Sequence, residues 1–117
     1  MTVTIYHNPL CSKSRQTLQL LKDNAVEPEV IEYLKEPPDR QTLLKVLSSL
    51  AMEPRDLMRK NESIYKELNL ADKSLSRDRL IDAMLANPIL IERPIVVVNN
   101  TAALGRPPEN VLKIIES

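Results

Sequence analysis

The chain contains few of the residues that build metal sites and disulfides. Its 117 residues include one cysteine, one histidine and one glycine, and no tryptophan or phenylalanine. One cysteine cannot form an internal disulfide, and one cysteine with one histidine cannot complete a four-ligand zinc site. We therefore expect neither a structural metal nor an internal disulfide.

An excess of one charge sign and a long apolar run are also absent. Lys and Arg number 16 and so do Asp and Glu, so no overall basic field favours nucleic acid or an anionic membrane. No apolar run approaches the ~20 residues of a membrane span, and the first residues lack the features of a signal peptide. We expect a cytoplasmic protein that binds any anion locally, and the neutral charge favours a monomer.

The order of the predicted elements indicates an α/β protein. Alternation over residues 2–6, helical spacing from residue 12 and a run over 29–33 predict a parallel β-α-β opening. Residues 95–98 and 101–104 predict two strands joined by a tight turn, and Pro107-Pro108 begins a closing helix. Between them we expect short helices, with Asp39 and Ser76 as N-caps.

This order, β-α-β, helical insertion, β-β-α, is that of the thioredoxin-like fold with a mixed central sheet. We expect a single domain over residues 1–117, with the helical insertion at about 38–88. In this fold a cis-proline before the third strand lies against a reactive cysteine. Pro94 takes that place, so the resemblance predicts a cis bond between Arg93 and Pro94.

Cys11 stands where the first strand runs into the first helix. The orphan N–H groups and the positive dipole end of a helix favour a thiolate over a thiol, and Lys13 and Arg15 add positive charge nearby. The alternative is that Cys11 is an inert, buried small side chain. The polar residues that follow it favour a nucleophile at the mouth of a site.

Two neighbours of Cys11 are candidates for supporting the thiolate. His7 could lower the pKa of the thiol as an imidazolium or through a hydrogen bond, or it could simply end the strand. The Ser14 hydroxyl lies one helical turn after Cys11, where it could donate to the thiolate or cap the helix.

Several short segments resemble the glutaredoxin-dependent arsenate reductases and their less characterised ArsC-like relatives, nearly end to end. They are His7-Asn8-Pro9 before Cys11, Ser14-Arg15 after it, Arg59-Lys60-Asn61, Asn87-Pro88-Ile89-Leu90-Ile91, Arg93-Pro94-Ile95-Val96-Val97 and Gly105-Arg106-Pro107. The resemblance implies that Cys11 attacks arsenate and that three arginines hold the oxyanion. The matching positions are Arg59, Arg93 and Arg106. Guanidinium groups suit this role because they are always charged and offer fixed forks of donors.

The lack of a second cysteine determines how turnover would proceed. Reduction of arsenate to arsenite takes two electrons, and Cys11 alone can form only an arsenic adduct and then a mixed disulfide with an outside thiol. The resemblance implies glutathione as the reducing co-substrate and glutaredoxin as the partner protein, with no bound cofactor and a role in arsenic detoxification. Neither the C-x-x-C motif nor the C-x5-R loop of other reductases is present, since Ser14 and Thr17 occupy those positions.

Ser12 and Lys13 follow the cysteine where well-characterised arsenate reductases of this type carry glycine and threonine. Two alternatives therefore stand beside arsenate reduction. The first is a glutathione-linked thiol oxidoreductase or deglutathionylating enzyme with another substrate. The second is a non-enzymatic redox regulator of the same fold that binds RNA polymerase, although that branch is typified by C-x-x-C and does not need an arginine set.

Overall fold

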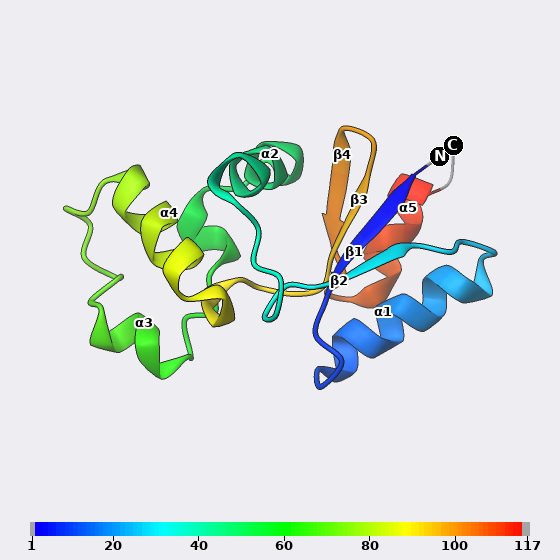
Figure 1. Cartoon of the computed structure of the whole chain (residues 1–117), viewed down its shortest axis with the longest axis horizontal. Helices are drawn as coiled ribbons and strands as arrows, with labels where there is room; N and C mark the ends of the chain where they lie inside the picture. The colour runs from blue at the N-terminus through cyan, green and yellow to red at the C-terminus, as the bar shows by residue number, and fades with distance from the viewer. Residues whose placement is uncertain (1, 116–117) are drawn as a thin grey trace. The chain divides into compact units, whose positions relative to one another are not determined.

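The computed structural model describes residues 2–115 and divides them into two compact units. Residues 2–36 and 93–115 form one unit, which carries the sheet, and residues 37–92 form the other, which is helical. Figure 1 shows the two sets of elements. The helical unit spans residues 37–92, and the insertion expected from the sequence spans about 38–88.

The sheet unit contains four strands in the order β2-β1-β3-β4. They are β1 (Val3–His7), β2 (Glu29–Glu32), β3 (Ile95–Val98) and β4 (Thr101–Leu104). β1 pairs in parallel with β2 and antiparallel with β3, and β3 pairs antiparallel with β4. The mixed sheet predicted from the sequence is thereby confirmed.

Helices α1 (Ser12–Asp23) and α5 (Leu112–Ile115), with the short 3-10 helix η3 (Pro108–Val111), complete this unit. Alternate residues of β1 are buried, as expected for a strand with one face against a core. The closing helix predicted from the sequence begins as the 3-10 helix η3 at Pro108 and continues as the α-helix α5. One buried cluster of the unit consists of six aliphatic side chains from the sheet, α1 and η3: Val3, Ile5, Leu21, Val96, Val98 and Val111.

The helical unit contains α2 (Arg40–Leu50), η1 (Pro54–Leu57), α3 (Ser63–Glu67), α4 (Arg77–Ala86) and η2 (Pro88–Leu90). Asp39 Oδ1 accepts a hydrogen bond from Thr42 N at 2.8 Å, and Ser76 Oγ accepts one from Arg79 N at 3.2 Å. Both predicted N-caps are confirmed. They satisfy N–H groups that the first turn of a helix leaves without a partner.

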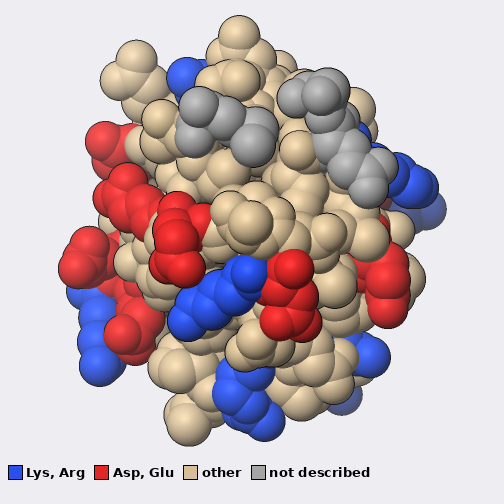
Figure 2. Space-filling model, turned by 90° about the vertical axis from the view of Figure 1, so that its right-hand side faces the viewer, with Lys and Arg blue, Asp and Glu red and all other residues tan. Residues whose placement is uncertain are grey.

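Charged side chains of both signs are interspersed on the face shown in Figure 2, which agrees with the balanced composition. No helix within residues 2–115 has the length and apolarity needed to cross a membrane.

Candidate active site

The loop between β1 and α1 presents Cys11. Cys11 is the N-cap residue of α1, with extended backbone angles of φ −96° and ψ 123°. Asn8 shapes the loop in two ways: its carbonyl oxygen accepts a hydrogen bond from Cys11 N at 3.0 Å, and its Oδ1 accepts one from Leu10 N at 3.0 Å. The Arg15 guanidinium also ties the first turn of α1 to the loop, since Nη1 donates to the Pro9 carbonyl at 2.9 Å. The position of the sulfur is therefore set by local hydrogen bonds.

The open end of the β3–β4 hairpin brings two predicted arginines to the cysteine. Ile95 pairs with Leu104, so continuing the antiparallel register places Pro94 opposite Gly105, and Arg93 opposite Arg106. Gly105 N donates to the Pro94 carbonyl at 2.9 Å, and Arg106 Nε donates to the Arg93 carbonyl at 2.8 Å. The Arg93–Pro94 bond is cis, and so is the Arg106–Pro107 bond.

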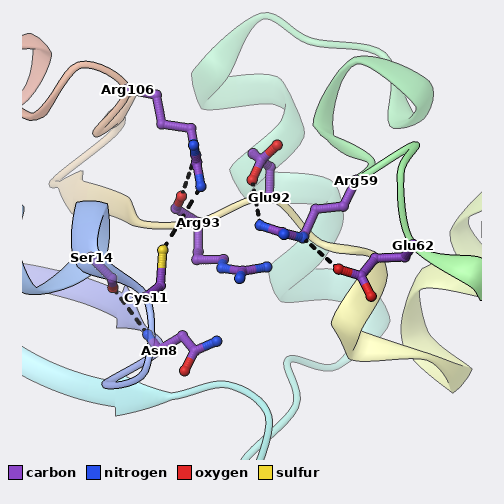
Figure 3. A network of polar contacts seen from close by, with 8 residues as sticks. All are labelled: Asn8, Cys11, Ser14, Arg59, Glu62, Glu92, Arg93 and Arg106. Atoms are coloured by element: carbon purple, nitrogen blue, oxygen red, sulfur yellow. Dashed lines mark hydrogen bonds and ion pairs between the residues drawn. The ribbon is translucent and has the colours of Figure 1, made fainter.

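Both arginines act on the Cys11 sulfur. Arg106 Nη2 lies 3.8 Å from Sγ (Figure 3). Burial raises the pKa of the thiol, and four other effects lower it. They are hydrogen bonds from the Ser14 backbone N–H, the Arg93 side chain and the Lys13 backbone N–H, and the charge of Arg93. The net effect is a pKa of Cys11 below its ordinary value, so the thiolate is favoured.

His7 and Ser14 lie beside this loop and bind each other. The Ser14 hydroxyl is 2.7 Å from His7 Nδ1 and accepts a hydrogen bond from Asn8 N at 3.0 Å (Figure 3 draws the Asn8 contact). All three residues are buried. The serine hydroxyl is therefore engaged by the loop and the histidine, and it is the serine N–H that acts on the sulfur.

The pKa of His7 is lowered. Burial is the largest cause; Glu32 opposes it, and the charges of Arg15 and Lys22 add to it. A neutral imidazole is thus favoured in the folded protein. It is well suited to accept the hydroxyl proton of Ser14 at Nδ1, because the serine oxygen already accepts from Asn8.

Arg59 belongs to the helical unit. Its Nε donates to Glu62 Oε2 at 3.1 Å and its Nη1 to Glu92 Oε1 at 3.2 Å (Figure 3). All three side chains are only about one-quarter exposed, so the two carboxylates hold the guanidinium in a fixed orientation.

Three further residues shape the site in ways that the sequence did not indicate, although Lys13 was named there for its charge. Asn8 and the backbone of Lys13 act at the cysteine loop, and buried Thr17 packs beside Gly105. Backbone donors leave no mark in a sequence. For the packing of Thr17 beside Gly105, the one available signal in the sequence was the lone glycine immediately before Arg106.

The described residues hold no cluster of three or more histidine, cysteine, aspartate or glutamate side chains arranged to bind a metal ion. The chemistry that residues 2–115 do support is that of a thiolate flanked by guanidinium groups. A negatively charged electrophile would meet the sulfur there with its charge offset by the two arginines.

Comparison with known proteins places this chain in a family. The sequence profile of the ArsC family matches residues 6–114. Over 114 residues the chain is 61% identical to the "uncharacterized protein YfgD" of Escherichia coli, covering 97% of this chain and 96% of that protein. It is 48% identical over 113 residues to an arsenate reductase of Escherichia coli, covering 97% and 80% of the two chains.

The solved structure of an arsenate reductase from Vibrio cholerae superimposes with a TM-score of 0.95 at 53% identity, covering 97% of this chain and 98% of that one. The predicted thioredoxin-like fold is confirmed by this agreement together with the mixed sheet. On the family profile and on these relatives, which match nearly the whole chain, this protein belongs to the ArsC family.

Proposed function

We propose that the protein is an arsenate reductase that uses Cys11 as its only nucleophile and an outside thiol as reductant. The observation that carries the proposal is the convergence of Arg93 and Arg106 on the Cys11 sulfur, with the pKa of the thiol lowered. The 48% identity to an arsenate reductase supports the choice of arsenate among oxyanions.

In the proposed reaction the Cys11 thiolate attacks arsenic, and an arsenate hydroxyl takes up a proton from the solvent and leaves as water. An S–As(V) bond thereby replaces an O–As bond. Arg93 and Arg106 offset the repulsion between the thiolate and the oxyanion. A glutathione thiolate then attacks Sγ, and the electron pair of the S–As bond stays on arsenic, which leaves as arsenite. The mixed disulfide of Cys11 and glutathione is reduced by glutaredoxin, which regenerates the thiolate. The cytoplasm, where glutathione keeps thiols reduced, suits this cycle.

Arg59 is proposed as the third arginine that binds the oxyanion. Its Nε and Nη1 are engaged by Glu62 and Glu92, and this pairing orients the planar guanidinium. We expect Arg59→Ala to raise the KM for arsenate more than it lowers kcat, because the arginine would act in substrate binding.

The test is arsenite production from arsenate with glutathione and glutaredoxin. We expect activity in the wild type, none in Cys11→Ser, and a loss of about 100-fold in Arg93→Ala, in line with the removal of one donor that stabilises an oxyanion. Arg77→Ala is the matched control, because Arg77 is an exposed arginine paired with Glu53 in the helical unit. Its activity should equal that of the wild type.

Two outcomes would contradict the proposal. Absence of arsenite production by the wild type would exclude arsenate as substrate. If the wild type instead released glutathione from a glutathionylated protein or peptide, the thiol oxidoreductase alternative would take its place. Equal activity in the wild type, Cys11→Ser and Arg93→Ala would exclude the site.

A further inference from the structure

The only glycine of the chain lies where the two arginine-bearing segments meet helix α1. A Cβ built on Gly105 would lie 2.5 Å from Thr17 Oγ1, 2.7 Å from Pro94 Cγ and 3.1 Å from Thr17 Cγ2. Ordinary van der Waals contacts begin at 3.4 Å, so the added atom would be 0.9 and 0.7 Å too close to the first two neighbours. The absence of a side chain at this position permits the close approach of the hairpin to the helix.

Thr17 is a rigid obstacle rather than a flexible one. Its side chain is fully buried, and Oγ1 donates to the Lys13 carbonyl at 2.8 Å while lying 3.5 Å from the Gly105 carbonyl. A change of the Thr17 rotamer would break the hydrogen bond to the Lys13 carbonyl inside a buried site, and that loss opposes the movement of this side chain. Any added atom at Gly105 would therefore displace the hairpin end rather than Thr17.

The segment after Gly105 is also held from its other side. Asn110 Nδ2 donates to the Arg106 carbonyl at 3.0 Å and lies 3.4 Å from the Leu104 carbonyl. Two contacts thus fix the backbone that carries Arg106. Gly105 packs against α1 on one side, and the side-chain amide of Asn110 binds the backbone on the other.

We infer that Gly105 and Asn110 are positioning residues that set the approach of Arg106 and Arg93 to the Cys11 sulfur. The geometry gives the path of the effect. Gly105 precedes Arg106 in the chain and is hydrogen-bonded to Pro94, which follows Arg93. A displacement at Gly105 consequently moves both guanidinium groups relative to the sulfur. The expected effect on arsenate turnover rests on the proposed function, whereas the effect on the thiol does not.

The experiment compares Gly105→Ala with the wild type in two measurements that need no arsenate. These are the pKa of Cys11, followed by the ultraviolet absorbance of the thiolate, and the rate of alkylation by iodoacetamide across pH. Cys11 is the only cysteine, so both signals report this residue alone. We expect the pKa of Cys11 to be higher in Gly105→Ala, because the displaced arginines stabilise the thiolate less.

Arsenate turnover provides the third measurement. A misplacement approaching 1 Å is expected to lower kcat/KM by about 10- to 100-fold. If the wild type does not reduce arsenate, the proposed function fails, and the thiol measurements still decide the present inference.

Three further variants separate positioning from general destabilisation. The double variant Gly105→Ala/Thr17→Ala removes the two Thr17 contacts. It should bring the pKa of Cys11 part of the way back to the wild-type value, because the contact with Pro94 remains. Asn110→Ala leaves residue 105 unchanged and should shift the pKa in the same direction by a smaller amount. Asn99→Ala is the matched control, because Asn99 has a φ of 55° in the turn at the opposite end of the same hairpin. It should destabilise the hairpin and leave the pKa of Cys11 as in the wild type.

The inference is overturned if Gly105→Ala folds and keeps the wild-type pKa and alkylation profile. It is equally overturned if Asn99→Ala shifts the pKa as much as Gly105→Ala does. Should Gly105→Ala fail to fold, the decision passes to Asn110→Ala, and a wild-type pKa in that variant refutes the inference.

Discussion

Replacing Ser14 with alanine should destabilise the protein far more than the loss of one small side chain suggests. The Ser14 hydroxyl is fully buried and serves two buried partners, the Asn8 N–H at 3.0 Å and His7 Nδ1 at 2.7 Å. In Ser14→Ala both partners lose their hydrogen bond while remaining out of water. Leaving a buried polar group unsatisfied costs about 1–3 kcal/mol, so two such groups give an expected loss of about 2–6 kcal/mol.

The assay is thermal and urea unfolding followed by circular dichroism. For a chain of this length the loss corresponds to a decrease in Tm of roughly 10–20 °C. Ser12→Ala is the matched control, because Ser12 occupies the same first turn of α1 and is exposed. Its expected change is within about 0.5 kcal/mol.

The result that would refute the reasoning is a similar, small change in both variants. It would mean that the Asn8 N–H and His7 Nδ1 are not sealed from water and that the hydroxyl adds little to the loop. A large loss confined to Ser14→Ala would support the view that the hydroxyl holds the loop carrying Cys11.

Two further predictions concern groups away from the sulfur. His7 should titrate below its ordinary pKa of about 6.5, chiefly because of burial, and NMR of the chain's only histidine would measure this directly. As the pH falls, the unfolded chain binds a proton at His7 before the folded protein does. The free energy of unfolding should therefore decrease as the pH falls from about 6.5 through the lower folded pKa. A free energy of unfolding that increases as the pH falls through this window would contradict the assignment. Ala51→Gly should raise stability by about 1 kcal/mol in urea unfolding, because exposed Ala51 ends α2 with a φ of 56°, and a decrease would refute this.

Local features of the sequence determined the elements and the place of Cys11. Alternation and helical spacing set the strand-to-helix junction that carries Cys11, and the short polar side chains of Asp39 and Ser76 begin their helices as predicted. These features depend on contacts between residues a few positions apart, which a sequence pattern records directly.

The contacts between distant segments were decided by the tertiary structure. The register of β3 on β4 places Arg93 opposite Arg106. The missing side chain at Gly105 permits close packing on α1, so that both arginines reach Cys11, which is nearly the whole length of the chain away. Ser14 illustrates the same limit at shorter range: its spacing from Cys11 suggested a hydroxyl aimed at the thiolate, whereas the burial of His7 on the core face of β1 draws that hydroxyl to the imidazole. Packing and register fix such choices because they depend on which groups the fold buries together, and residue spacing along the chain does not contain that information.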